Sequence, residues 1–235
     1  MTPLAGGTAV VTGASRGIGR AIAIQLARAG AELALWARDR NALADVAREI
    51  ERTGGRAVPM VVDVTDAAAV TAAAQAVRRT MSPVRTVVNN AGAVLRKPTA
   101  EITEAEWRRV IAVNLDGTFH VTRAFLEDLS GGGRIINIAS RSGREGTALL
   151  AAYCAAKHAV VGLTRALAEE VRAAKVSVNA ICPGSVDTAM LREGLPDARP
   201  DMTPDDIAAT AVFLASPPPS GAPAALTGAC IDVYG

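Results

Sequence analysis

The segment Thr12–Gly19 reads TGASRGIG, and it lies between an apolar run, Thr8–Val11, and a helical pattern, Arg20–Ala29, that ends at Gly30. A second apolar run, Glu32–Trp36, follows the helical pattern. A strand, a glycine-rich turn, a helix and a second strand in this order predict a βαβ unit of the length that binds a dinucleotide.

The three glycines of this turn have different expected tasks. Gly13 permits the sharp exit from the strand, Gly17 lets the backbone approach a pyrophosphate, and Gly19 lets the helix pack closely on the sheet. The first N–H groups of the helix have no partners within the helix, so they attract an anion. We therefore predict a phosphate-binding turn formed by Gly13, Ser15, Arg16, Gly17, Ile18 and Gly19.

Further short apolar runs alternate with helix-length segments along the rest of the chain. They are Ala57–Val62, Val84–Val88, Arg134–Ile138, Val176–Ile181 and Cys230–Val233. This alternation predicts an α/β fold: a Rossmann-type, doubly wound parallel sheet of about seven strands with helices on both faces. We expect one domain over residues 1–235, with the Pro-rich segment 217–223 as a surface loop before the last strand.

Composition disfavours several classes of protein and partner. The 25 basic and 23 acidic residues form no long run of one charge, so no nucleic-acid surface is expected. Cys154, Cys182 and Cys230 are far apart, which favours a reducing, cytoplasmic setting. No segment reads as a signal peptide or a membrane anchor. His120 and His158 belong to no cluster of metal ligands, and no metal is predicted.

The residue at the end of the second strand distinguishes the two nicotinamide cofactors. An acid there accepts a hydrogen bond from a ribose 2′-hydroxyl, whereas an arginine pairs with a 2′-phosphate. Arg38 occupies this place, and Arg16 in the glycine turn adds a second positive charge. The two arginines favour NADP(H), while Asp39 one residue later leaves NAD(H) possible.

Tyr153 and Lys157 stand four residues apart in the segment Ala151–Ala174, which predicts one long helix. Residues at this spacing share a helix face. A tyrosine has an ordinary pKa of about 10, and a neighbouring ammonium favours the phenolate and lowers that pKa. The pair is therefore a candidate acid–base catalyst, although taken alone it also fits a half-buried structural face.

Six signals in order along the chain resemble the short-chain dehydrogenase/reductase family. They are the glycine turn, Asn89-Asn90-Ala91-Gly92, Asn114, Ser140, Tyr153-Cys154-Ala155-Ala156-Lys157 and Pro183-Gly184. The resemblance covers nearly the whole chain. It implies an oxidoreductase that transfers a hydride between NADP(H) and a carbonyl or secondary alcohol of a small molecule, in a homo-oligomer that is a tetramer or a dimer.

The resemblance also implies a role for each matching catalytic residue. Ser140 hydrogen-bonds the substrate oxygen, and Tyr153 is the acid and base. Lys157 lowers the pKa of Tyr153 and holds the nicotinamide ribose, and Asn114 supports a proton-relay water. Ser142 is an alternative to Ser140 because both follow the same strand, but the family's spacing from serine to tyrosine favours Ser140.

Further cofactor contacts are implied by the same resemblance. Asp63 is expected beside the adenine, Asn90 against the cofactor and Thr188 towards the nicotinamide carboxamide. Each has a simpler alternative: Asp63 ends a strand, Asn90 stabilises its own turn, and Thr188 caps a helix. The remaining expected contacts are Val64, Ala91, Gly92, Pro183, Gly184 and Val186.

Two segments depart from the family pattern. The stretch Ala189–Met202 is shorter than the region that often covers the substrate in relatives, which predicts a more open site. The chain closes on Val233-Tyr234-Gly235, where relatives tend to end in a glycine pair.

The substrate is the least determined part of the sequence analysis. The alternatives are a 3-oxoacyl carrier-protein reductase and, in another class, a non-catalytic dinucleotide-sensing protein. The acidic pair Glu127-Asp128 argues against docking of an acidic carrier, and Arg96, Arg141 and Arg144 flank the expected opening. We therefore expect a free small ketone or keto acid.

Overall fold

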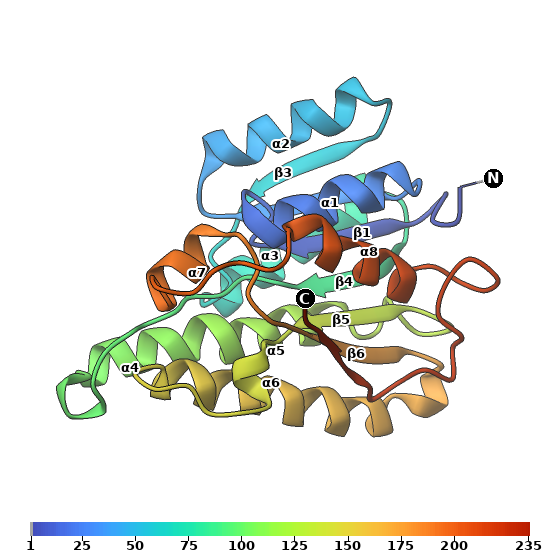
Figure 1. The fold of residues 1–235 in the computed structure, drawn as a ribbon. Coiled ribbons are helices and arrows are strands. Elements are labelled where there is room, and N and C mark those ends of the chain that lie inside the picture. Colours follow the sequence, from blue (N-terminus) through green and yellow to red (C-terminus); the bar gives the residue numbers. More distant parts are fainter. Residues whose placement is uncertain (1) are drawn as a thin grey trace.

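The computed structural model describes residues 2–235 and builds them around one seven-stranded parallel sheet (Figure 1). Every neighbouring pair of strands is parallel. The seven predicted strands are confirmed, with ends that shift by one or two residues. They are β1 (Thr8–Thr12), β2 (Glu32–Ala37), β3 (Ala57–Val61), β4 (Val84–Asn89), β5 (Arg134–Ile138), β6 (Ser177–Pro183) and β7 (Cys230–Val233).

The strand order β3-β2-β1-β4-β5-β6-β7 makes the sheet doubly wound. From β1 the chain builds outward through β2 and β3, and it then returns to place β4 on the other side of β1. The connections after β1 and β4 therefore leave the sheet in opposite directions. A crevice opens at the carboxyl ends of these two strands, which is where ligands bind in open α/β sheets.

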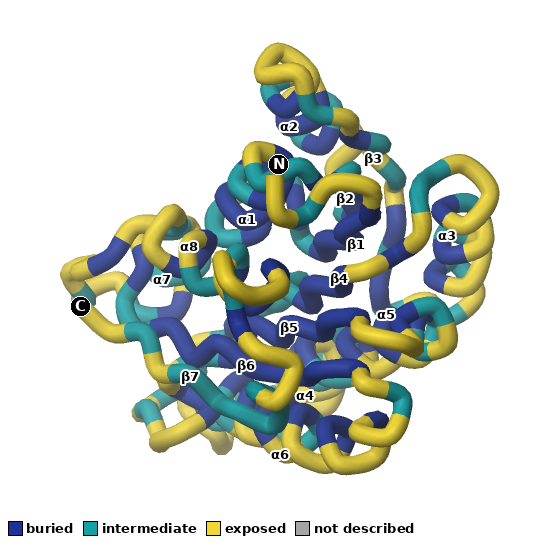
Figure 2. The backbone as a smooth tube through the Cα atoms, turned by 90° about the vertical axis from the view of Figure 1, so that its right-hand side faces the viewer, coloured by how far each residue is buried: buried dark blue, intermediate teal, exposed yellow. Residues whose placement is uncertain are grey.

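Helices cover both faces of the sheet, as predicted. One apolar cluster joins the sheet to α1 (Gly17–Arg28), α2 (Arg40–Arg52) and α8 (Pro204–Ala215). The other joins it to α3 (Ala67–Thr80), α5 (Gly117–Phe125) and α6 (Ala151–Glu170). The inner strands β1, β2, β4, β5 and β6 consequently form the dark, buried centre of Figure 2, whereas the edge strands β3 and β7 and the outer helix faces are more exposed.

Two helix boundaries differ from the sequence prediction. Helix α1 begins at Gly17, inside the glycine turn, so the turn and the helix start are one structure. The long helix α6 ends at Glu170, and Arg172–Ala174 form a separate 3-10 turn. This turn ends at Lys175, whose φ of 58° is left-handed and stops any helix.

Most helix starts are closed by an acid or a threonine, but the start of α1 is not. Asp39 caps α2 and Asp66 caps α3, while Thr103 caps α4 (Glu104–Ile111). Arg16 at the start of α1 makes no side-chain capping hydrogen bond, and the first turn of α1 contains no acid. The N–H groups there are left for an external acceptor.

Two further segments complete the chain. A short helix, α7 (Ala189–Gly194), occupies the segment predicted to be a reduced lid. The Pro-rich segment 217–223 contains no helix or strand, which confirms the predicted loop. Within residues 2–235, no helix combines the length and hydropathy needed to cross a membrane.

The packing of α1 on β1 yields a stability prediction. A Cβ added at Gly19 would overlap the carbonyl oxygen of Gly13 and the side-chain amide of Asn90. Gly19→Ala should lower the free energy of unfolding by about 1–3 kcal/mol, because backbone atoms have to move. Urea unfolding followed by circular dichroism measures the change.

Gly162→Ala is the matched control. Gly162 lies within α6, it is exposed, and a Cβ there meets no atom within 4 Å. Alanine should raise the free energy of unfolding by about 0.5–1 kcal/mol, because glycine is costly inside a helix. Equal unfolding midpoints for Gly19→Ala and the unmodified protein would contradict the packing argument.

Candidate active site

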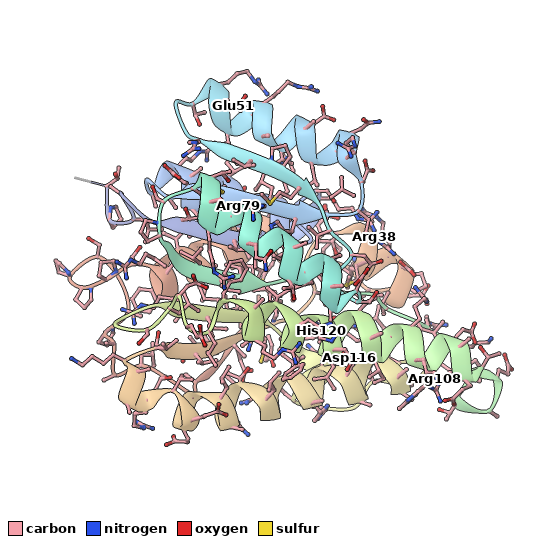
Figure 3. All side chains as sticks on the ribbon, turned by 180° about the vertical axis from the view of Figure 1, so that it is seen from behind. Arg38, Glu51, Arg79, Arg108, Asp116 and His120 are labelled. Carbon is pink, nitrogen blue, oxygen red and sulfur yellow. The ribbon has the colours of Figure 1, made fainter. Side chains whose placement is uncertain are left out.

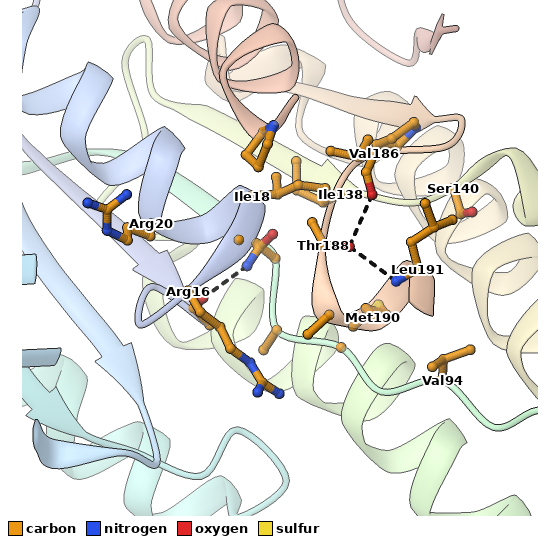
Figure 4. Close-up of a pocket in the computed structure, with 18 of the residues that line it drawn as sticks. Arg16, Ile18, Arg20, Val94, Ile138, Ser140, Val186, Thr188, Met190 and Leu191 are labelled. Atoms are coloured by element: carbon orange, nitrogen blue, oxygen red, sulfur yellow. Dashed lines mark hydrogen bonds between the residues drawn. The ribbon is translucent and has the colours of Figure 1, made fainter. Parts of the chain in front are cut away.

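A cleft of about 950 Å³ opens at the carboxyl ends of the strands. Its volume is that of a site for a large organic ligand. The turn after β1 forms one end of the cleft, and α7 with the loop after β5 forms the other. Figure 4 shows Arg16 and Ile18 on the first side, and Ser140, Met190 and Leu191 on the second.

The cleft brings together nearly all of the predicted site residues. Gly19 and Asn114 are the exceptions: Gly19 packs behind the turn, and Asn114 is fully buried. The predicted residues that line the cleft are Gly13, Ser15, Arg16, Gly17, Ile18, Arg38, Asp63, Val64, Asn90, Ala91, Gly92, Ser140, Tyr153, Lys157, Pro183, Gly184, Val186 and Thr188.

Hydrogen bonds hold the glycine turn against the end of β4. The Thr12 hydroxyl oxygen accepts from the backbone N–H groups of Asn90 (2.9 Å) and Ala91 (3.0 Å). The Asn90 side-chain amide donates to the carbonyl oxygens of Thr12 (2.9 Å) and Gly13 (3.3 Å). Asn90 thus braces the neighbouring turn and not only its own, and Gly13 adopts a left-handed φ of 64°.

Arg38 directly follows β2 and lies at the surface (Figure 3). Asp63, which follows β3, is close to it. The Arg38 side chain is 78% exposed, and its guanidinium is 4.0 Å from the Asp63 carboxylate. A hydrogen bond from the Thr65 backbone lowers the pKa of Asp63, and the charge of Arg38 lowers it further. The Asp39 carboxylate accepts from the Ala42 N–H and is therefore engaged in capping α2.

Tyr153 and Lys157 share a face of α6 and are both buried, as their spacing predicts. The Lys157 ammonium donates to the carbonyl oxygen of Ile138 (2.7 Å) and lies 5.7 Å from the centre of the Tyr153 ring. Ser140 follows β5 and faces the same cleft. The hydroxyl of Ser140 accepts from the Ser142 N–H at 3.1 Å.

Burial dominates the pKa values of this group. Burial raises the pKa of Tyr153 to about 12, although a hydrogen bond with Ser140 acts in the opposite direction. Burial also lowers the pKa of Lys157 to about 8. The sequence argument considered only the ammonium, which favours the phenolate, and it therefore missed the larger effect of desolvation. In this state Tyr153 is a neutral proton donor at pH 7.

Asn114 is placed by a short π-helical segment, Ala112–Asp116, between α4 and α5. Its side-chain amide donates to the carbonyl oxygens of Ala93 (2.7 Å) and Val110 (2.8 Å). Its side-chain oxygen is buried and has no hydrogen-bond partner within residues 2–235. A buried acceptor without a hydrogen bond costs free energy, so the Asn114 oxygen is suited to accept a hydrogen bond from a bound water.

Thr188 lines the cleft and also caps α7. Its hydroxyl oxygen accepts from the Leu191 N–H (3.2 Å) and donates to the carbonyl oxygen of Val186 (3.3 Å), as the dashed lines in Figure 4 show. The helix-capping alternative therefore holds geometrically.

Sequence reasoning missed the apolar wall at the substrate end of the cleft. Its members come from three separate segments, so no local pattern links them. They are Val94 in the loop after β4, Leu150 before α6, and Met190, Leu191 and Leu195 in and after α7.

Two of the three arginines expected near the opening, Arg141 and Arg144, are paired with acids. Only Arg141 of the three expected residues lines the cleft, and it pairs with Glu145 at 2.5 Å. Arg144 pairs with Asp232 at 3.2 Å. The acidic pair at residues 127–128 precedes β5, so it lies at the opposite end of the sheet from the cleft. Asp128 pairs there with Arg78 at 2.6 Å.

The histidines and cysteines take structural places. The Nδ1 atom of His120 is 3.1 Å from the carbonyl oxygen of Val64, and that of His158 is 2.9 Å from the carbonyl oxygen of Cys154. All three cysteines are free. Among residues 2–235, no group of three or more His, Cys, Asp or Glu side chains is arranged to hold a metal ion.

Comparison with known proteins gives consistent results. The family model described as short chain dehydrogenase matches residues 7–198. Galactitol 2-dehydrogenase (L-tagatose-forming) from Cereibacter sphaeroides is 42% identical, over 99% of this chain and 95% of its own length. The 3-oxoacyl-[acyl-carrier-protein] reductase FabG of Pseudomonas aeruginosa is 36% identical, over 99% of this chain and 97% of its own.

A solved structure extends the likeness to three dimensions. It is a protein from Beutenbergia cavernae, assigned as an NAD(P)-dependent gluconate 5-dehydrogenase and solved with bound NADP. It has a TM-score of 0.91 and 41% identity, covering 99% of this chain and 97% of the other. The expected family is therefore confirmed: the chain belongs to the short-chain dehydrogenase family, oxidoreductases that act on CH–OH groups with a nicotinamide dinucleotide.

Proposed function

We propose that the protein interconverts a carbonyl group and a secondary alcohol on a free small molecule, with NADP(H) as its cofactor. The observation that carries the proposal is the placement of Ser140, Tyr153 and Lys157 around one end of a cleft whose other end is the glycine turn. An oxygen bound at that end meets a hydroxyl donor and a proton donor together. A protein that only senses a dinucleotide has no need of this set.

The residues present fit a dinucleotide. Gly13 has no room for a side chain, since a Cβ there would lie 2.8 Å from the Asn90 side-chain nitrogen. The uncapped start of α1 leaves N–H groups for a pyrophosphate. Asp63 and Val64, which line the cleft, would then contact the adenine, and Lys157 would hold the nicotinamide ribose. The cofactor supplies the hydride that reduces the carbonyl carbon.

Each catalytic residue then has one task during reduction. The Ser140 hydroxyl donates to the carbonyl oxygen and orients it. Tyr153, neutral at pH 7, gives its phenolic proton to that oxygen as the alcohol forms. The Lys157 ammonium stabilises the phenolate that remains. The free side-chain oxygen of Asn114 accepts from a water that returns the proton.

The preference for NADP(H) rests on the charges around Arg38. Arg38 directly follows β2 and lines the cleft, and its exposed guanidinium, 4.0 Å from the Asp63 carboxylate, would pair with a 2′-phosphate there. Asp39, the competing acid, already accepts from the Ala42 N–H. The Beutenbergia cavernae protein, similar over nearly the whole chain, was solved with bound NADP.

The proposal of a free substrate rests on the charge at the opening. An acidic carrier protein needs unpaired positive charge at the site where it docks. Arg141 and Arg192 line the cleft and are each paired with an acid, so they offer little attraction to a carrier. The acidic pair at residues 127–128 adds no support, because it lies at the other end of the sheet.

Tyr153→Phe should lower turnover by at least about 10²-fold, because it removes the proton donor from a buried ring. NADPH binding, measured by calorimetry, should be nearly unchanged. Tyr234→Phe is the matched control, since Tyr234 is exposed near the end of the chain, and its rates should equal those of the unmodified protein. Unmodified rates from Tyr153→Phe would remove Tyr153 from the mechanism.

Kinetics with the two cofactors should show a preference for NADPH over NADH in kcat/KM of about 10- to 100-fold. This is the effect of one charge-assisted contact with a phosphate. Ala37→Asp combined with Arg38→Leu should reverse the preference. Arg40→Leu removes a neighbouring exposed charge that does not line the cleft, and it should leave the preference unchanged. A tenfold preference for NADH in the unmodified protein would mean that Asp39 governs the site.

Small free ketones should be reduced with a kcat/KM at least equal to that of an acetoacetyl group on a carrier protein. The two substrates are compared at the same ionic strength, because attraction between charged surfaces depends on salt. A clear advantage of the carrier-bound substrate that disappears at high salt would show a docking surface and refute the proposal of a free substrate.

A further inference from the structure

Ser142 and Thr147 place two hydroxyl groups in the substrate end of the cleft, and the proposed reaction uses neither. Both residues line the cleft, and their hydroxyl oxygens are 3.3 Å apart. Ser142 is only 7% exposed, so its position is set by packing. We refer to these two residues as the hydroxyl pair.

Packing against α6 fixes the first member of the hydroxyl pair. Ser142 lies in the 3-10 turn Arg141–Gly143, and its N–H donates to the hydroxyl of Ser140. Gly143 touches α6 so closely that a Cβ there would lie 2.7 Å from the carbonyl oxygen of Lys157. The turn cannot shift without moving the helix that carries Tyr153. The hydroxyl of Ser142 is therefore held at a set place relative to the reacting groups.

The second member is held by a strained turn. The Leu150 N–H donates to the carbonyl oxygen of Thr147 at 3.2 Å, which closes a four-residue turn. Within it Leu149 has a φ of 67°, a left-handed conformation that a branched side chain disfavours. The carbonyl oxygen of Leu149 accepts from the Lys97 N–H at 2.8 Å. Strain of this kind persists when neighbouring contacts impose it, and it is concentrated at ligand sites.

The bonding capacity of the hydroxyl pair indicates what it can bind. Two hydroxyls have two donor hydrogens and four acceptor lone pairs, and their mutual hydrogen bond uses one of each. One donor and three acceptors remain, which complements an alcohol or a carbonyl oxygen. A carboxylate accepts only, and Arg141, the arginine of the same turn, is already paired with Glu145. The apolar wall of Val94, Leu150 and Met190 suits the carbon atoms of the substrate.

We infer that Ser142 and Thr147 bind a second oxygen of the substrate, on the carbon next to the reacting one, and that the substrate is a neutral vicinal diol or the corresponding α-hydroxy ketone. The inference rests on the proposed function, in which Ser140 and Tyr153 hold the reacting oxygen. Ser142 belongs to the same tight turn as Ser140, so the second oxygen lies close to the first.

The reaction balances with the cofactor already proposed. In the reduction of the α-hydroxy ketone, the carbonyl carbon gains a hydride from NADPH and its oxygen gains the phenolic proton of Tyr153. The products are the vicinal diol and NADP⁺, and a proton from solvent restores the neutral tyrosine. The second hydroxyl is unchanged throughout, and it serves only for binding and orientation.

Paired substrates that differ by one oxygen test the inference. For the unmodified protein, kcat/KM should be at least about 10-fold higher for 3-hydroxy-2-butanone than for 2-butanone, and likewise for 2,3-butanediol over 2-butanol. Thr147→Val and Ser142→Ala should bring these ratios close to one. Thr147→Ser keeps a hydroxyl and should retain the ratio.

Three outcomes would overturn the inference: equal kcat/KM for the paired substrates, ratios that the variants leave unchanged, or pyruvate reduced better than 3-hydroxy-2-butanone. A binding measurement separates this failure from that of the proposed function. Calorimetry compares 2,3-butanediol with 2-butanol on the protein saturated with NADPH, a complex that cannot react. If no substrate turns over, the proposed function fails, whereas tighter diol binding that Thr147→Val abolishes still supports the hydroxyl pair. Equal binding of the two alcohols overturns the inference.

Discussion

The close contact between the turn after β1 and the residues after β4 is the constraint on which the rest of the structure depends. Three hydrogen bonds join Thr12 to Asn90 and Ala91, at the point where the strand order reverses. These bonds fix the two loops that border the crevice created by the strand order. They also explain why the turn tolerates no bulk, because Gly13 and Gly19 both face the Asn90 amide.

A second network connects the catalytic helix to the sheet. The Asn89 side chain donates to the Asn137 side chain (2.9 Å), which donates to the hydroxyl of Thr164 on α6 (2.9 Å). The three groups are buried, so the bonds are strong and an alternative register of α6 would leave them unpaired. Lys157 adds a bond to the end of β5. The position of Tyr153 is thus fixed through the sheet, and the same burial raises its pKa.

The sequence predicted what depends on local pattern. The strands follow from short apolar runs. The glycine turn follows from glycines at positions where the backbone conformation or a close contact excludes a side chain. Most unpredicted features depend on contacts between distant residues. The pairing of Arg144 with Asp232 joins the loop after β5 to β7, and the raised pKa of Tyr153 reflects burial by several elements. Asp39 is a local exception, because its carboxylate accepts from the Ala42 N–H three residues later and so caps α2.

The two ends of the cleft are built in different ways, and this difference bears on specificity. At the cofactor end, backbone atoms and glycines form the surface, so few substitutions are tolerated. At the substrate end, side chains from three loops form the walls, and these loops contact one another through bonds such as that from Lys97 to Leu149. Exchanging a side chain on such a loop alters the substrate pocket without disturbing the turn that binds phosphate. The left-handed Leu149, two residues after Thr147, shows that this end of the cleft accepts backbone strain, which persists where neighbouring contacts impose it.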